Sequence, residues 1–275
     1  MKIDLHVHTT ASDGLLSPKA IVAKAKENKI DILAIADHDT IDGIPEAMNA
    51  ANEKGIRLIP ALEISAKHEK QIHILGYYVD YKDLKFQSFV NKLKNSREDR
   101  NQKMLKKLEN FGFEITMDEL KASAEGNIGR PHIADLMIKK GYVSTFAEAF
   151  EKYIGDNGPA YVHKPEFSVQ EAIQVIHEAD GFAIIAHPGD LANPAYVDDI
   201  IKMGIDGLEV WHPDHNLSQI AYFTDLCKNL GLYMTGGSDF HGDNERYNLF
   251  EEVPASEVIL ESVNKLWREY KCRIN

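Results

Sequence analysis

Short apolar runs alternate with amphipathic stretches over the first 80 residues of the chain. Apolar runs of about four to eight residues, bounded by polar or turn residues, favour buried strands, whereas apolar residues at helical spacing favour amphipathic helices. Strands are expected at 3–7, 32–36, 58–64 and 72–79, and helices at 17–28 and 44–54. This alternation of strand and helix predicts parallel βα units.

The middle of the chain has a different pattern, in which charged stretches with helical spacing follow one another. Helices are expected over 84–111 and near 117–124, 130–139 and 146–153. No strand-like run appears between Val79 and Ala160. We therefore expect a helical insertion over residues 86–165, which would form a cap over a site built by residues 1–85 and 166–275.

Strand and helix alternate again after this segment. Strands are expected at 182–186, 207–211 and 233–236, and helices at 169–178, 195–203, 217–229 and 256–270. The total is about seven strands, and the chain has no internal repeat. Its 275 residues suffice for one large α/β domain with a substantial insertion. The pattern therefore predicts an α/β fold.

Composition excludes several classes of protein. The sequence has no run of about 18 apolar residues, and its first residues, MKIDLHVHTT, lack the apolar stretch of a signal peptide. We expect a cytoplasmic protein without membrane contact. Its two cysteines, Cys227 and Cys272, form no CxxC pattern and cannot build a thiolate zinc site.

The chain is acidic, with a formal net charge of −12. Such a chain offers no general basic surface to long duplex nucleic acid. Bound divalent cations would nevertheless make one pocket locally positive. A small anionic substrate therefore remains compatible with the negative net charge of the chain. Nothing in the sequence implies an obligate protein partner.

Histidines and carboxylates recur at or near one end of the expected strands. One pair such as His6 and His8, which share a strand face, is weak evidence because such pairs also arise by chance. The repetition on nearly every strand is the stronger signal. The recurring residues are His6, His8, Asp13, Asp37, His38, Asp39, Glu63, His73, His187, His212, His215, Asp239 and His241. In a barrel, residues at the carboxyl ends of the strands form the active site.

The types of these residues predict a metal centre. Imidazole and carboxylate without thiolate suit Mn²⁺, Fe²⁺ or Zn²⁺. About nine candidate ligands exceed the three or four that one catalytic ion needs, so we expect more than one ion. Neighbouring ions suit the hydrolysis of phosphoesters, because they clamp the attacking and leaving oxygens and lower the pKa of a bridging water.

Several motifs together resemble the PHP (polymerase and histidinol phosphatase) superfamily. They are HVHTTASDG, ADHDT, IHILGYY, AHPG and GSDFH, with the strand-end Glu63, and they cover residues 4–79 and 182–241 in the right order. The insertion, with GRPHIADLMIKKGYV, resembles the subgroup that includes nucleoside 3′,5′-bisphosphate phosphatase and the 5′→3′ exoribonuclease called RNase AM. Ala36 departs from the family, which usually has Thr there, but this is not a ligand position.

The resemblance implies a distorted (β/α)₇ TIM-like barrel with two or three divalent ions, Mn²⁺ first and Fe²⁺ or Zn²⁺ as alternatives. It also implies how the ligands are divided among the ions. The first ion would be held by His6, His8, Glu63 and Asp239, the second by Glu63, His73 and His187, and the third by Asp13, His38 and His241. Asp37 and Asp39 are expected to support these ligands rather than to bind metal.

The insertion is expected to contact the substrate. Pro131 suits the first turn of a helix, and Arg130 beside the free N–H groups of that turn could clamp a phosphate. The resemblance assigns Arg130 and His132 to the non-reacting phosphate of the substrate. His215, in the loop after the sixth strand, is a further candidate for substrate binding.

The leading hypothesis is hydrolysis of the 3′-phosphate of a nucleoside 3′,5′-bisphosphate by a metal-bound hydroxide. A short oligonucleotide with a 5′-phosphate could use the same clamp and be shortened from its 5′ end. Alternatives are histidinol-phosphate phosphatase or another small-molecule phosphomonoesterase, amide or deaminase chemistry, and a non-catalytic PHP module with a structural or regulatory role. The GRPH segment weighs against the first of these, and the complete set of ligands weighs against the last.

Overall fold

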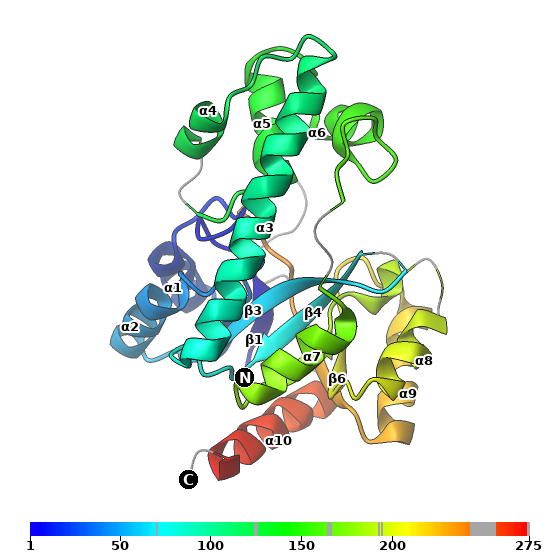
Figure 1. Ribbon diagram of the computed structural model, residues 1–275. Coiled ribbons are helices and arrows are strands. Elements are labelled where there is room, and N and C mark those ends of the chain that lie inside the picture. Colours follow the sequence, from blue (N-terminus) through cyan, green and yellow to red (C-terminus); the bar gives the residue numbers. More distant parts are fainter. Residues whose placement is uncertain are drawn as a thin grey trace.

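The strands of this protein form one mixed sheet that curls into a barrel (Figure 1). The computed structural model describes residues 1–69, 71–123, 126–163, 167–191, 193, 195–242 and 257–273. In spatial order the strands are β1 (Ile3–Val7), β2 (Ile32–Ile35), β3 (Arg57–Lys67), β4 (Gln71–Tyr77), β5 (Phe182–Ile185), β6 (Gly207–Trp211) and β7 (Tyr233–Gly236). A parallel bridge between Val7 and Phe240 joins the two edges of the sheet. The predicted α/β barrel is thereby confirmed.

Helices cover the outside of the barrel. They are α1 (Pro18–Glu27), α2 (Ile44–Lys54), α7 (Val169–Glu178), α8 (Ala195–Lys202), α9 (Leu217–Leu230) and α10 (Glu257–Arg273). Local chemistry sets their ends. The Ser17 side chain accepts a hydrogen bond from the Ala20 N–H and so caps α1. Gly55 and Gly231 end α2 and α9 in the left-handed conformation, with φ of 67° and 70°.

Strand β4 runs antiparallel to both of its neighbours, β3 and β5, whereas the other described strand pairs are parallel. The prediction of parallel units throughout is therefore wrong for this strand. Only residues 68–70 separate β3 from β4, and a parallel pair needs a crossover of about a dozen residues or more. Because β4 is reversed, its first residues lie at the rim where the other strands end. His73 thus reaches the same end of the barrel as Glu63.

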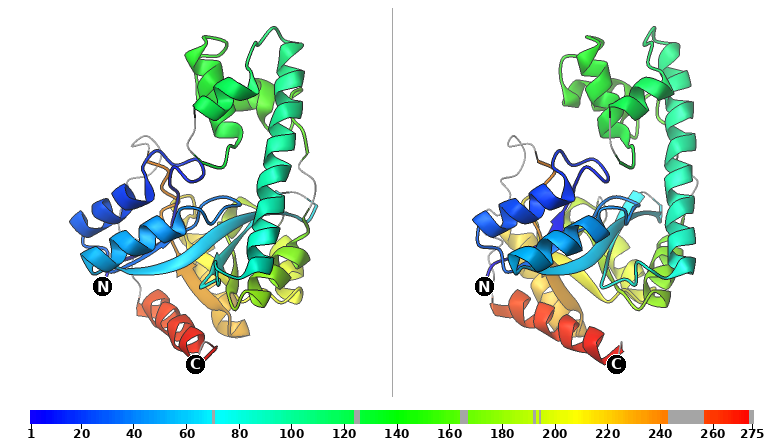
Figure 2. Two further views of the ribbon diagram at one scale, coloured as in Figure 1. Left: turned by 60° about the vertical axis from the view of Figure 1, so that its left-hand side comes forward. Right: turned by 90° about the vertical axis from the view of Figure 1, so that its left-hand side faces the viewer.

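A group of helices stands above this rim (Figures 1 and 2). It comprises the upper part of α3 (Leu84–Glu109), α4 (Met117–Ala122), α5 (Arg130–Lys139), α6 (Phe146–Ala149) and the π-helix η1 (Phe150–Ile154). These helices pack around an apolar cluster of their own, which includes Met104, Leu108, Ile133 and Met137. The lower part of α3 instead packs in the barrel core through Phe86, Val90 and Leu93. We refer to the described residues between Arg97 and Val162 as the cap.

Some expected boundaries cannot be compared with the structure. The expected helix end at Ala124, the helix start at Ser256 and the insertion boundary at residues 165 and 166 lie outside the described residues. Within the described ranges, no helix is both long enough and apolar enough to cross a membrane.

Candidate functional site

The nine histidines and carboxylates expected to bind metal lie together at the rim of the barrel. Glu63, on β3, is buried at the centre of this cluster. Five imidazole nitrogens surround its carboxylate, at 3.3 Å (His6), 3.3 Å (His8), 2.9 Å (His38), 2.7 Å (His73) and 3.3 Å (His187). Residues from β1, β3, β4 and the segments after β2 and β5 thus meet at one carboxylate.

Two further carboxylates extend the cluster to one side. Oδ1 of Asp239 lies 3.0 Å from His8 Nε2, and Oδ1 of Asp13 lies 3.6 Å from His241 Nε2. Three groups have all their candidate ligand atoms within 4.8 Å of one another: His8, Asp13, His38 and His241; His6, His8 and Glu63; and His38, Glu63 and His73. His38 therefore lies in two groups, one of them with Glu63, whereas the resemblance implies only that it joins Asp13 and His241.

The arrangement of atoms in this cluster fits bound cations. In the described part of the chain, several of its buried atoms have no hydrogen-bond partner of suitable geometry: His6 Nε2, His8 Nε2, His38 Nδ1, His73 Nδ1 and Glu63 Oε2. Buried polar atoms are nearly always hydrogen bonded, so this concentration needs an explanation. Nitrogen and carboxylate lone pairs that converge without hydrogen-bond geometry are the arrangement that a shared divalent cation would satisfy.

Burial and neighbouring groups shift the pKa values of the clustered residues in different directions. Burial alone would raise the pKa of Glu63, but its electrostatic interactions with His38, His73 and His6 outweigh burial and hold this pKa well below its usual value. Burial lowers the pKa of His8 and the pKa of His73. Glu63 is therefore ionised at neutral pH, and these two imidazoles are neutral. At His6, His187 and His241, neighbouring carboxylates outweigh burial and raise the pKa, so protons occupy positions that bound cations would take.

Glu209, which the sequence analysis did not single out, supports two residues of the cluster. This buried carboxylate on β6 lies 3.1 Å from His6 Nδ1 and accepts the backbone N–H of His187 at 2.8 Å. By holding a proton on His6 Nδ1, Glu209 leaves Nε2 as the nitrogen that would bind a cation beside Glu63. The available signal was an acidic residue within the apolar strand GLEVW, because a buried carboxylate needs a partner.

Asp37 fixes the loop after β1, in the supporting role expected for it. Its Oδ1 accepts hydrogen bonds from the Thr9 N–H at 2.7 Å and from Ser12 Oγ at 2.6 Å, and its Oδ2 accepts one from Thr9 Oγ1 at 2.7 Å. Both oxygens are thus engaged by the loop that leads to Asp13. These hydrogen bonds hold the loop in a defined position.

Three residues that follow strands at the rim have a positive φ. They are Asp39 (50°), His187 (28°) and Asp239 (51°). This conformation is uncommon for residues other than glycine, costs about 1–3 kcal/mol each, and is concentrated at functional sites. The backbone is therefore strained where the chain turns from β2, β5 and β7 into the cluster.

Gly237 allows β7 to approach β1 closely. A Cβ atom at this position would lie 2.3 Å from the Cβ of His6. We expect Gly237→Ala to lower the free energy of unfolding by about 1–3 kcal/mol, because the added methyl group must displace β7 or His6. Urea denaturation, with and without added Mn²⁺, measures this change. Unchanged stability and unchanged metal affinity would contradict the close packing of these strands.

A buried arginine of the cap, Arg97, reaches the rim. Its Nε donates to Asp39 Oδ2 at 2.5 Å, and its Nη2 donates to Ser65 Oγ at 3.1 Å. A Cβ atom on Gly129 would lie 3.1 Å from Nη1, so the guanidinium also lies against the start of α5. Arg97 thus connects α3, the barrel and α5. The sequence analysis did not single it out, because one charged residue among many on a helix looks solvated.

Two further arginines lie close together in the cap. Arg100 is only 4% exposed, and its Nε donates to the Val162 carbonyl at 2.8 Å. Its buried Nη2 has no hydrogen-bond partner among the residues that the structure describes. The guanidinium groups of Arg100 and Arg130 lie 5.3 and 5.5 Å from the Tyr161 ring centroid. Burial and the charge of Arg130 lower the pKa of Arg100 to about 10, so the Arg100 guanidinium remains charged at neutral pH.

The GRPH segment begins helix α5 as predicted. Nη1 of Arg130 donates to Asp156 Oδ1 at 2.6 Å. Nδ1 of His132 accepts the Gly129 N–H at 3.0 Å, and burial lowers the pKa of His132. The neutral His132 ring therefore carries its proton on Nε2, which can donate a hydrogen bond to an anion.

His215 lies beside the cluster, with both ring nitrogens engaged by the backbone. Nε2 accepts the Gly189 N–H and Nδ1 donates to the Val210 carbonyl, each at 3.0 Å. It thereby holds the turn after β5. His212 lies closer to the cluster, with its Nε2 3.6 Å from Asp239 Oδ2.

Comparisons with known proteins agree with this geometry. The PHP domain matches residues 4–160. A 5′-3′ exoribonuclease of Haemophilus influenzae is 38% identical over 247 residues, which cover 87% of this chain and 90% of that protein. A 3′,5′-nucleoside bisphosphate phosphatase of Chromobacterium violaceum is 30% identical and covers 99% of this chain and 97% of its own.

A solved structure agrees as well. It is a metal-dependent phosphoesterase from Bifidobacterium adolescentis, with a TM-score of 0.87 and 31% sequence identity, and the match covers 96% of this chain and 94% of that one. The family match includes the clustered residues from His6 to His73, and the Chromobacterium violaceum relative and the solved structure cover nearly the whole chain. The chain therefore belongs to the PHP domain family.

Proposed function

We propose that this chain removes the 3′-phosphate of nucleoside 3′,5′-bisphosphates and also shortens 5′-phosphorylated oligonucleotides from the 5′ end. Metal-dependent hydrolysis of a phosphoester follows from the family and the cluster. The observation that carries the finer proposal is the group of three cap arginines, Arg97, Arg100 and Arg130, beside the rim of a chain with net charge −12. The activities named for the two curated relatives support it.

The cluster would hold the metal ions. We propose two or three ions, with Mn²⁺ as the native metal, bound by His6, His8, Asp13, His38, Glu63, His73, His187, Asp239 and His241. Bound ions would supply a water of lowered pKa and neutralise charge on the phosphoryl oxygens. Glu63 is central to this proposal because it faces five of the imidazole nitrogens.

The cap would hold the second phosphate of the substrate. The guanidinium of Arg130 is a donor for phosphate oxygens, and so is Nη2 of Arg100, which has no partner among the described residues; His132 Nε2–H is a third donor. Anchoring the 5′-phosphate there fixes which ester reaches the metals. We assign His215 a supporting role at this site, because backbone groups engage both of its ring nitrogens.

The alternative functions are less favourable at this site. Histidinol phosphate carries one phosphate and a cationic amine, so the arginines would repel the end of the molecule that the cap must hold. A non-catalytic role would not require nine clustered ligands. A metal-reconstituted panel of adenosine 3′,5′-bisphosphate, 5′-phosphorylated short RNA, histidinol phosphate and an aryl phosphate tests the proposal. Faster hydrolysis of histidinol phosphate than of the bisphosphate would overturn it.

Arg130→Ala tests the anchoring of the second phosphate. We expect the ratio of kcat/KM for the bisphosphate to that for the aryl phosphate to fall roughly tenfold to hundredfold, because a charge-assisted hydrogen bond contributes about 1.5–3 kcal/mol. The control is Arg268→Ala, an exposed arginine on α10 at the opposite end of the barrel (Figure 1). Equal losses on both substrates would show that Arg130 only stabilises the cap.

A further inference from the structure

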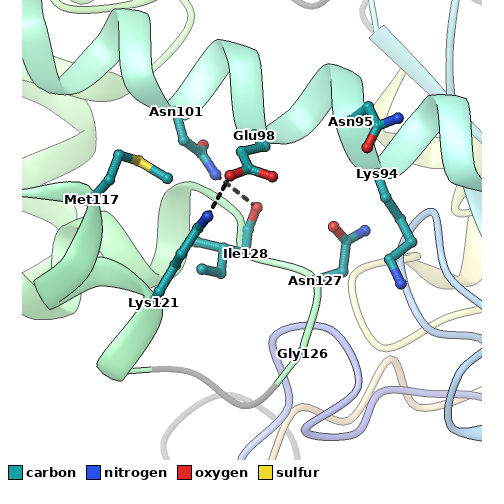
Figure 3. Close-up of a pocket in the computed structure, with 9 residues that line it drawn as sticks. All are labelled: Lys94, Asn95, Glu98, Asn101, Met117, Lys121, Gly126, Asn127 and Ile128. Carbon is teal, nitrogen blue, oxygen red and sulfur yellow. Dashed lines mark hydrogen bonds and ion pairs between the residues drawn. The ribbon is translucent and has the colours of Figure 1, made fainter.

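A cavity of about 240 Å³ lies between α3, α4 and the segment that precedes α5 (Figure 3). It is lined by Lys94, Asn95, Glu98, Asn101, Met117 and Lys121 from the two helices, and by residues 126–128 from the segment. None of the nine clustered residues and none of the three cap arginines lines it. It is therefore distinct from the metal rim and from the proposed phosphate anchor.

One wall of this cavity contacts the metal rim directly. The side-chain Nδ2 of Asn127 donates to the His38 carbonyl at 2.8 Å, and its backbone N–H donates to the Ala11 carbonyl at 2.7 Å. A Cβ atom on Gly126 would lie 2.2 Å from the Thr10 carbonyl oxygen, so the segment is pressed against the loop after β1. Asn127 would thus contact both a group bound in the cavity and His38 of the cluster.

Both lysines of the cavity are paired with carboxylates. Lys94 lies 2.5 Å from Asp42, and Lys121 lies 2.5 Å from Glu98, a pair that Figure 3 shows across the cavity. At the proposed phosphate anchor, by contrast, Arg100 Nη2 has no hydrogen-bond partner among the described residues, so the cavity is the less suitable of the two sites for a phosphate. It is better suited to a neutral group.

The remaining polar groups are amides. In the described part of the chain no hydrogen bond engages the Asn95 side chain, and Asn127 uses its amino group for His38, which leaves its carbonyl oxygen as an acceptor. Asparagine amides match the donor and acceptor pattern of a base edge. Met117 adds a polarizable thioether, which makes favourable contacts with aromatic rings. The volume lies below the roughly 300–1,000 Å³ of pockets for drug-sized ligands, so one ring system fits.

We propose that this cavity binds a nucleobase. Resting on the proposed function, we assign it to the base of the second nucleotide of a 5′-phosphorylated strand, whose first nucleotide is anchored by the cap arginines. A separate nucleoside offers the same chemistry. The cavity would make the enzyme sensitive to the base that follows the scissile ester.

The test compares the turnover of two substrates by two variants, one that fills the cavity and one that removes an amide from its wall. The substrates are 5′-phosphorylated diadenylate and the same dinucleotide with an abasic second ribose. Asn95→Trp fills the cavity from an exposed position of α3, and Asn95→Ala removes the amide without added bulk. Asn91→Trp, the same change one helical turn earlier and outside the cavity, is the matched control.

We expect the native protein to favour the base-bearing dinucleotide roughly two- to tenfold in kcat/KM, the range that one net hydrogen bond supplies. This preference should disappear in both Asn95 variants and remain in Asn91→Trp. If the two dinucleotides have equal kcat/KM, but the native protein binds adenosine and Asn95→Trp does not, the ligand is a separate nucleoside.

Other results would overturn the proposal. A preference for the base that survives in Asn95→Trp would show that the base is bound elsewhere. The cavity takes no base if the two dinucleotides have equal kcat/KM and adenosine does not bind. The same conclusion follows if they have equal kcat/KM and adenosine binds Asn95→Trp as well as it binds the native protein. Failure of the proposed function appears separately, as lack of turnover on the bisphosphate and both dinucleotides. In that case the adenosine binding measurement still decides whether the cavity takes a base.

Discussion

Glu63→Gln is expected to lower kcat by at least roughly 10²-fold and to reduce the number of bound metal ions. Removing one preorganised group that stabilises charge in an active site, such as an oxyanion-hole donor, typically costs about 10²–10³ in kcat. Glutamine keeps the shape of the side chain but loses its charge. It also directs an NH₂ donor at the imidazole nitrogens that the carboxylate faces, two of which, on His38 and His73, lie within 2.9 Å.

Metal content by mass spectrometry and turnover of the bisphosphate together measure this effect. The matched control is Glu209→Gln, the same change in a buried carboxylate that contacts His6 but that we do not propose as a ligand. There we expect metal affinity to fall by about 10–100-fold, because a residue that only orients a ligand is removed. Full metal content and activity in Glu63→Gln would refute the proposed centre.

Arg97→Met is expected to lower the free energy of unfolding by about 3–5 kcal/mol and to raise KM for the bisphosphate. The loss of stability follows because the substitution removes the guanidinium from the buried carboxylate of Asp39, which accepts from Arg97 Nε at 2.5 Å. The rise in KM follows because Arg97 lies beside Gly129 at the start of α5, where the proposed phosphate anchor begins.

A double substitution separates these two effects. Arg97→Met with Asp39→Asn no longer buries an ion without its counterion, so we expect urea denaturation to show most of the stability recovered. KM for the bisphosphate should remain high, because no guanidinium is restored. Recovery of both quantities in the double variant would mean that Arg97 stabilises the cap and does not contribute to substrate binding.

The positions of the strands and of the clustered residues were predictable because they depend on local patterns. An apolar strand that ends in a histidine or carboxylate places that residue at the rim, and the pattern recurs from His6 to His241. The direction of β4 was not predicted, although the short connection at residues 68–70 contained the information. Connection length, rather than the apolar pattern of the strand, decides between parallel and antiparallel pairing.

The arginines of the cap were harder to predict for a different reason. Arg97 and Arg100 belong to a charged helix, and the spacing of charges alone does not show which face is buried. Their burial depends on packing of the cap against the barrel, which involves residues far away in sequence, such as Asp39 and Val162. Glu209 is an intermediate case, because a carboxylate within an apolar strand indicates burial but does not identify its partner.

The reversal of β4 also determines how the cap is attached. Strand β4 ends at the side of the barrel opposite the rim, so α3 starts at that side and must extend along the barrel to reach the cap (Figure 2). Its 26 residues span about 39 Å. Each residue of a helix adds about 100° of rotation. A one-residue insertion between Val90 and Arg97 would therefore swing Arg97 and Arg100 away from the rim. The lower part of α3 must keep its helical phase, whereas the parts of the cap beyond Arg100 can change length without disturbing it.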